Sequence, residues 1–479
     1  MKKYILILSA IVALSNTACR KIETDGQIQV VTINTGGGGG TTGQTITVEG
    51  RITSDTTFKK ANTYVLKGLV YIANNKTLTI EPGTTIKGSF SGSDVAALIV
   101  TRGAKIVANG TATEPIIFTS ASPNPQSGDW GGIVICGKAP INTSFNGTAG
   151  LFEVEGGVNN ASGDGLAGSG DAVVPTAIAN DSSGVLRYVR IEYAGYAFQP
   201  DKEINSLTMA AVGSKTVIEN VQTYLAKDDA FEWFGGTVNC KYLVAYKTQD
   251  DDFDTDNGYS GKVQFGLAIR DSVIADASRS EAFESDNNAG GTTVTPKTSV
   301  VFSNMTAIGP RATATSVGSS LYRAGAHIRR NSEMSLLNSV IIGWPLGIEV
   351  DGTTGTATGA NVGTGLVLAN NFLGGNTDSI KYSAPAGSTY TTADLVTYFK
   401  ATAQANTILN GTLPNTLFIQ PFNYATPDPT PFGNATAIVT KASFTNAKVA
   451  DAFFTPTNFI GAIAPNGALS SWWKGWTRF

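Results

Sequence analysis

The most regular feature of this chain is a short unit in which apolar and polar residues alternate, turn at a glycine and alternate again. Residues 78–86 (LTIEPGTTI) and 98–106 (LIVTRGAKI) superimpose with an offset of 20, and Gly83 falls on Gly103. Alternation gives a strand one inward face, and glycine adopts the backbone angles that a sharp corner needs. A strand-bearing repeat of this length predicts a solenoid, in which each turn of chain stacks on the one before.

The repeat continues through most of the chain. The apolar runs 116–118 and 133–135 follow the first two units, and a later region repeats with an offset of 22 that places Tyr224 on Tyr246. Aromatic residues at fixed places in successive turns predict a ladder of rings inside the coil. We therefore predict an all-β protein whose main body, residues 46–352, is a parallel β-helix.

Two regions depart from this pattern. Residues 142–183 are rich in Gly, Asn, Ser and Asp and are predicted to form a long surface loop that leaves one turn of the coil. Residues 353–479 are predicted to be a small irregular α+β segment that covers the C-terminal end of the coil or one of its sides. This segment contains a predicted helix at 392–404, capped by Thr391. Its tryptophans are expected to fill a core rather than stack on sugars: Trp472, Trp473 and Trp476.

Three stretches share a motif of an acid, a small or acidic residue, Phe and a second acid. They are residues 229–232 (DAFE), 251–254 (DDFD) and 281–284 (EAFE). Stacked in adjacent turns, they predict a column of phenylalanines inside the coil and a column of carboxylates outside. Carboxylates about 4.8 Å apart repel each other by roughly 1 kcal/mol in water, and by more where they are desolvated. Such a column has to be neutralised.

Three ways of neutralising the column are open: an interleaved arginine, a bound hard cation or carboxyl groups with raised pKa values. Arg329 is the candidate arginine, and the predicted column runs Glu232, Asp254, Glu284, Arg329 and Glu349. A second predicted column, two places on, runs Phe234, Asp256, Asp286 and Asn331.

The cation hypothesis has a definite set of ligands. Asp252, Asp254 and Asp256 alternate as at the start of a calcium loop, but the next glycine comes one place too late and no closing glutamate follows, so this is not an EF-hand. We predict that these three residues and Glu284 bind Ca²⁺. A solvated acidic turn without an ion is an equally weighted alternative.

The same residues suggest an enzymatic alternative. A glycoside hydrolase would use two of Asp252, Asp254 and Glu284 as acid and base, or as a nucleophile. A polysaccharide lyase would use Ca²⁺ held by these acids and a basic residue such as Arg270 or Lys247. The carboxylate geometry decides between enzyme and binding protein. Two carboxylates that face an open groove near a basic group favour an enzyme. Acids tied to Arg329 or to backbone amides favour binding or structure.

The start of the chain resembles an export signal. Residues 1–18 contain a basic start and a short apolar run, too short to span a bilayer. Cys19 follows small residues, as in a bacterial lipoprotein signal, so we predict that it is lipidated. Residues 19–45 are polar and include five glycines at 36–40, which predicts a flexible tether. This order indicates a protein displayed on a membrane.

Composition narrows the chemistry. The formal charge is −3, too mild to indicate nucleic acid as a partner. The one histidine, His327, excludes histidine-rich metal sites, makes a Ser-His-Asp triad improbable and favours a structural role. Cys136 and Cys240 lie in apolar runs several predicted turns apart, farther than a disulfide reaches, so we predict two buried, unpaired thiols.

Five motifs resemble a family of Bacteroidota surface lipoproteins. They are residues 78–84, 128–132, 231–236, 251–261 and 472–476. The resemblance implies a right-handed β-helix of the pectin-lyase-like type and a lipid-anchored place on the outer membrane. The function of that family is not established, so the resemblance implies no activity.

Two functions are therefore expected. The favoured one is a non-enzymatic surface lipoprotein that binds a glycan or another outer-membrane protein. The alternative is the carbohydrate-active enzyme described above. Fold alone does not choose between them.

Overall fold

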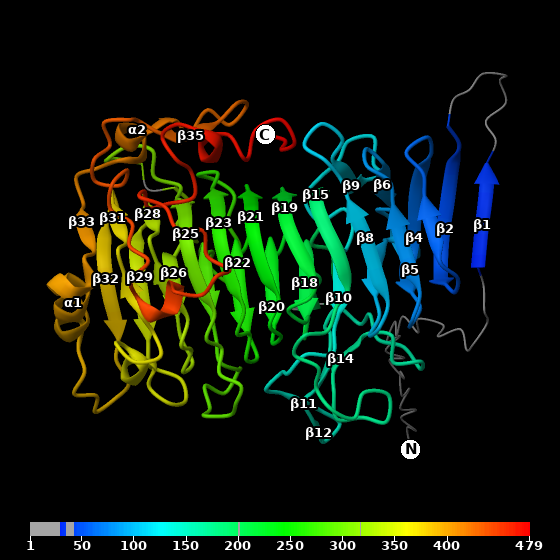
Figure 1. The fold of residues 1–479 in the computed structure, drawn as a ribbon, viewed down its shortest axis with the longest axis horizontal. Helices are drawn as coiled ribbons and strands as arrows, with labels where there is room; N and C mark the ends of the chain where they lie inside the picture. The colour runs from blue at the N-terminus through cyan, green and yellow to red at the C-terminus, as the bar shows by residue number, and fades with distance from the viewer. Residues whose placement is uncertain (1–28, 35–42, 200–201, 317) are drawn as a thin grey trace, which may run out of the picture.

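The structure, a computed structural model, describes residues 29–34, 43–199, 202–316 and 318–479 (Figure 1). Its strands stack turn on turn along one long axis and form a right-handed parallel β-helix, which confirms the predicted fold class. The predicted signal peptide, Cys19 and the glycine run lie outside the described residues. In the part of the chain that is described, no helix is both long and apolar enough to cross a bilayer.

Three stacks of parallel strands form the walls of the coil. The first wall, here called the acidic sheet, contains β7 (Ala97–Val100), β10 (Ile133–Cys136), β18 (Leu207–Ala210), β20 (Phe231–Phe234), β22 (Phe253–Asp256), β24 (Phe283–Ser285), β26 (Ala324–Ile328), β29 (Leu346–Asp351) and β32 (Asp378–Ser383). The second wall contains β3 (Thr56–Phe58), β5 (Thr77–Ile80), β8 (Lys105–Asn109), β27 (Ser335–Leu337) and β30 (Leu368–Ala369). The third contains β2 (Thr45–Ile52), β6 (Thr85–Gly88), β9 (Ile116–Ser120), β28 (Val340–Ile342), β31 (Phe372–Gly374) and β33 (Thr407–Leu409).

Longer strands bend across two walls. Strand β4 (Thr63–Ile72) joins the third wall to the acidic sheet, and β2 pairs with it along both parts. Five strands join the second wall to the third: β15 (Gly184–Glu192), β19 (Val217–Tyr224), β21 (Asn239–Tyr246), β23 (Lys262–Ile269) and β25 (Val301–Ile308). At the N-terminal end, β1 (Gln29–Asn34) pairs antiparallel with β2, so the predicted tether at 19–45 contains a strand.

The excursion at 142–183 leaves the acidic sheet and forms small antiparallel pairs of its own. Strand β11 (Ser144–Phe145) pairs with β12 (Thr148–Ala149), and β13 (Leu151–Glu153) pairs with β14 (Leu166–Gly168). A further hairpin, β16 (Ala197–Gln199) and β17 (Lys202–Glu203), follows β15.

The coil extends past its predicted end at residue 352. Strands β32 and β33 pair in parallel with β29 and β31, so further turns follow that the fading repeat did not reveal. Helix α1 (Thr392–Lys400) lies at this end of the coil (Figure 1). Thr391 caps it, as predicted, and forms a capping box with Asp394. The helix ends at Lys400 rather than 404 because Ala401 adopts ψ 139°. The remaining elements are α2 (Pro414–Leu417), β34 (Phe418–Gln420) and β35 (Asp428–Pro431).

A column of phenylalanines runs through the core beneath the acidic sheet. The rings of Phe231 and Phe253 are 5.8 Å apart at 9°, and those of Phe253 and Phe283 are 5.3 Å apart at 26°. All three side chains are fully buried in the main apolar cluster. The repeated motif therefore predicted the register of these phenylalanines correctly.

The predicted tyrosine ladder stacks, but on the outer face of the coil. Tyr224 and Tyr246 are paired in register with ring centres 5.7 Å apart. Val221 packs in the main core, and Tyr224 is an odd number of residues away, so alternation puts it on the opposite face. There the tyrosines meet the C-terminal segment, whose Trp473 and Trp476 are buried in the same cluster. The tryptophans thus fill a core, as predicted.

Cys136 and Cys240 are both buried and unpaired, as predicted. Burial raises the pKa of each thiol to about 12. At neutral pH the thiols are therefore protonated and unreactive.

Candidate functional site

The predicted carboxylate column forms on the outer face of the acidic sheet, with one correction. Glu232 lies beside Asp254, and Asp254 lies beside Glu284. The next position belongs to His327, not to Arg329. The prediction was wrong by two residues because the long connection between β24 and β26 carries no repeat by which to count the register.

The column continues as His327 and Glu349, so Glu349 keeps its predicted place. The same two-residue error affects the second column. Ser285 pairs with Ile328, so the position that follows Asp286 in the second column falls on Arg329. The predicted Asn331 lies farther along the chain.

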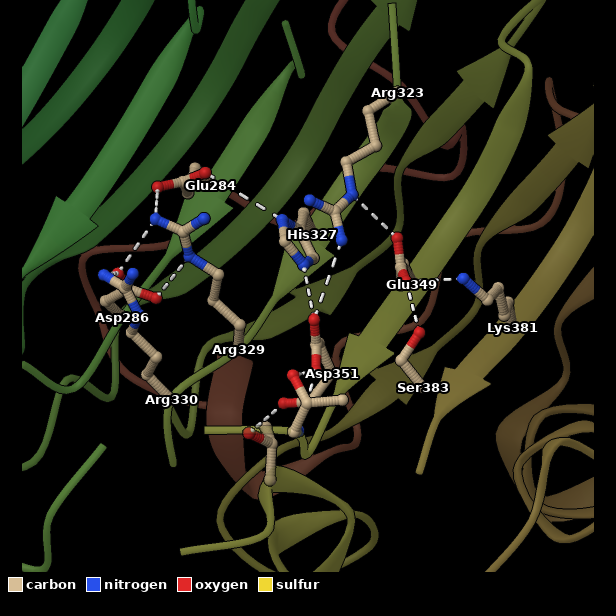
Figure 2. A network of polar contacts seen from close by, with 12 residues as sticks. Glu284, Asp286, Arg323, His327, Arg329, Arg330, Glu349, Asp351, Lys381 and Ser383 are labelled. Carbon is tan, nitrogen blue, oxygen red and sulfur yellow. Dashed lines mark hydrogen bonds and ion pairs between the residues drawn. The ribbon is translucent and has the colours of Figure 1, made fainter. Parts of the chain in front are cut away.

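The C-terminal half of the column is neutralised by basic side chains (Figure 2). Arg329 contacts the carboxylate of Glu284, and its Nε lies 2.8 Å from Oδ1 of Asp286. Arg330 lies 2.7 Å from the other oxygen of Asp286. Burial opposes ionisation of Glu284, but His327 and Arg329 outweigh it and lower the pKa of Glu284. Arg329 therefore neutralises the column, although from a neighbouring position.

His327 is a buried bridge between turns. It is 1% exposed, and its two ring nitrogens lie 3.4 Å from Asp351 and 3.3 Å from Glu281. Burial disfavours the charged ring, but its contacts with these acids outweigh this and raise the pKa of His327 to about 10. The imidazolium is therefore a permanent structural charge at neutral pH.

Glu349 is held by three donors. Arg323 and Lys381 lie 2.9 and 3.0 Å from its oxygens, and Ser383 donates a further hydrogen bond. Burial opposes its charge, but these donors lower the pKa of Glu349 to about 2. This end of the column is fully compensated.

The N-terminal half has no such compensation. Among the described residues, seven carboxylates on and beside the acidic sheet make no ion pair with a basic side chain: Asp228, Asp229, Glu232, Asp250, Asp251, Asp254 and Asp256. Burial, and then repulsion between neighbouring carboxylates, raises the pKa values of Glu232 and Asp254 well above their usual range. Here the column is either partly protonated or bound to a cation.

The first acids of the first two motifs tie adjacent turns together. Asp229 accepts a 2.8 Å hydrogen bond from the backbone N–H of Asp251, and Asp251 accepts one of 2.6 Å from that of Glu281. Sequence reasoning missed this role, although the constant acid at the first motif position is its signal. These hydrogen bonds fix the register of adjacent turns, which places the second acids of the motifs, Glu232, Asp254 and Glu284, in one column.

The four predicted calcium ligands do not come together. Asp252 lies at the corner before β22, where strand alternation does not hold, and points inward to Arg270 at 3.3 Å, with both side chains fully buried. Glu284 is held by Arg329, and Asp256 accepts hydrogen bonds from its neighbour Asn257. Asp254 is brought instead into a triad with Asp229 and Glu232, in which one oxygen of each lies within 4.8 Å of the others.

The two predicted lyase bases are engaged elsewhere. Arg270 is buried and donates to the backbone carbonyls of Thr248 and Glu281. Lys247 lies 3.0 Å from Asp271 and 4.6 Å from the ring centre of Tyr424, in the C-terminal segment. In the described structure neither base pairs with a carboxylate of the outer column, so the predicted lyase constellation is not assembled.

A cleft of about 480 Å³ lies beside the uncompensated carboxylates. One wall comes from the excursion and the other from β20 and β22; the lining residues are Phe152, Glu153, Val154, Glu155, Gly157, Asn159, Phe234, Asp256 and Asn257. The rings of Phe152 and Phe234 pack against each other in its lining, with ring centres 4.8 Å apart. The excursion at 142–183 therefore builds half of the candidate site. Its composition, rich in Gly, Asn, Ser and Asp, did not indicate this role.

The fold and this site define a β-helix of the pectate-lyase type with an acidic cleft. Residues 50–413 match the family described as the pectate-lyase like beta helix domain, so the chain belongs to this family. A search of curated proteins found no match. Among solved structures, the chain is similar to PfbA, a surface adhesin of Streptococcus pneumoniae, with 13% identity and a TM-score of 0.27, over 74% of this chain and 81% of that one.

Proposed function

We propose that this protein is a non-enzymatic surface protein that binds neutral glycans in the cleft beside its acidic sheet. The cleft itself carries the proposal. Phe152 is half-buried and supplies flat apolar surface, with the buried ring of Phe234 packed against it. Asn159, Asn257 and Asp256 supply amide and carboxylate groups for sugar hydroxyls. The described residues that line the cleft include acids, among them Glu153, and no basic side chain to pair with an anionic sugar, which favours uncharged sugars.

The proposal includes display on the outer membrane. Residues 1–18 would be removed, Cys19 would carry the lipid, and the glycine run would let the coil extend from the surface. The order of these segments in the sequence supports this anchoring, as does the resemblance to Bacteroidota lipoproteins.

A glycoside hydrolase is the second candidate, and one observation favours it. Oxygens of Asp229, Glu232 and Asp254 lie within 4.8 Å of one another, close to the separation of about 5 Å used by retaining hydrolases. Raised pKa values at Glu232 and Asp254 suit a proton donor. A lyase is less favoured, because Arg270 pairs with Asp252 and Lys247 with Asp271 rather than with a carboxylate of the outer column.

A glycan array followed by a hydrolysis screen tests both functions. We expect wild-type protein to bind neutral glycans, Phe152→Ala to weaken binding at least about tenfold, and Phe90→Ala to leave it unchanged. Phe90 is a matched control because it is an exposed ring, 40% accessible, outside the cleft. Binding that survives Phe152→Ala, or the absence of any neutral ligand, would refute the proposal. Sugar release that is lost in both Glu232→Gln and Asp254→Asn would establish the hydrolase instead.

A further inference from the structure

A second group of carboxylates lies at the corners that precede β22 and β24. One oxygen from each of Asp250, Asp251 and Glu281 lies within 4.8 Å of the other two. Two oxygens bound to one Ca²⁺ ion at about 2.4 Å can be no more than about 4.8 Å apart. The three residues therefore lie at distances that one ion can span.

Two carboxylate oxygens of these residues are buried without a partner. The side chain of Glu281 is 1% exposed, and its Oε2 has no hydrogen bond. Oδ1 of Asp250 is likewise buried and unpartnered, while its Oδ2 accepts a hydrogen bond from Ser278. A buried carboxylate oxygen without a donor is costly, and a cation would remove that cost at both atoms.

Nearby basic groups do not replace the ion. His327 and Arg323 lie 3.3 and 3.7 Å from the other oxygen of Glu281. However, His327 also pairs with Asp351, and Arg323 also pairs with Glu349.

Arg270 approaches the same corner without neutralising it. It donates to the backbone carbonyls of Asp250 and Glu281, and its ion pair is with the carboxylate of Asp252. Each nearby basic side chain also pairs with an acid outside this group. The carboxylates of Asp250, Asp251 and Glu281 therefore keep a net negative charge.

We propose that Asp250, Asp251 and Glu281 bind one hard divalent cation of the Ca²⁺ class, which joins two adjacent turns of the coil. Its ligands are all carboxylate oxygens, which suit Ca²⁺ rather than a metal that prefers nitrogen or sulfur. Asp250 is half-buried and gives the ion a route from solvent. This site shares no residue with the ligand set predicted from the sequence, and it does not depend on glycan binding in the cleft.

Calorimetric titration of chelator-treated full-length protein with CaCl₂ tests the site. We expect one Ca²⁺ per chain and a melting temperature raised by roughly 2–5 °C at saturating ion. Asp250→Asn, at the accessible edge, and Glu281→Gln should each weaken the affinity at least about tenfold. Asp254→Asn, in the neighbouring triad of Asp229 and Glu232, is the matched control and should bind as wild type does.

Two results would overturn the assignment. One is the absence of both heat and a melting shift with Ca²⁺ and with Mg²⁺ in the wild-type protein. The other is loss of binding in Asp254→Asn with binding retained in Asp250→Asn, which would place the ion in the neighbouring triad.

Discussion

Replacing Arg329 by glutamine should destabilise the coil strongly at neutral pH. Its guanidinium contacts Glu284 and Asp286, whose side chains are 15% and 5% exposed, and Arg329 itself is 23% exposed. Removing one member of a buried ion pair costs about 3–5 kcal/mol, because the partner charge stays buried. Partial exposure of Arg329, and the contacts that Arg330 and His327 keep with these acids, reduce this cost. We therefore expect the free energy of unfolding to fall by about 3 kcal/mol.

Urea unfolding at pH 7 and at pH 3 measures this loss. The pKa of Glu284 is lowered in the folded state, so its stabilisation is present above its unfolded pKa and disappears as pH falls through the folded value. The difference between Arg329→Gln and wild type should therefore shrink at pH 3. Arg330→Gln is the matched control: it removes the same charge one residue away, from a side chain 32% exposed with one ion pair, and should cost about 1 kcal/mol or less.

Equal effects of the two substitutions at pH 7 would refute the reasoning. A loss in Arg329→Gln that is as large at pH 3 as at pH 7 would also refute it, because packing rather than charge would then be responsible.

Two further predictions concern buried ionisable groups. Glu349, whose pKa is lowered to about 2, should make wild-type stability fall between about pH 4.5 and pH 2, and Glu349→Gln should flatten this part of the curve in thermal melts followed by circular dichroism; an unchanged slope would contradict the assignment. Cys136 and Cys240, with pKa values raised to about 12 by burial, should resist alkylation in the folded protein at pH 8 and react on unfolding. Peptide mass mapping checks this, and a disulfide between the two or rapid labelling of native protein would contradict it.

Local repetition was enough to predict the coil and its inner column. The motifs at 229–232, 251–254 and 281–284 each begin a strand of the acidic sheet, and their phenylalanines stack in register because each motif recurs after one turn. Where a long connection intervenes, as between β24 and β26, counting fails, and His327 took the place expected for Arg329.

The fold class, the phenylalanine column and the outward acids were therefore predictable from local patterns, because alternation and a constant repeat are local properties. Which acids pair with a basic side chain depends instead on contacts formed in the folded chain. Asp252 turned inward to Arg270 at a corner, Glu284 met Arg329, and the excursion folded back over β20 and β22 to form a cleft. These contacts join residues far apart in the chain, whose distances no local pattern encodes.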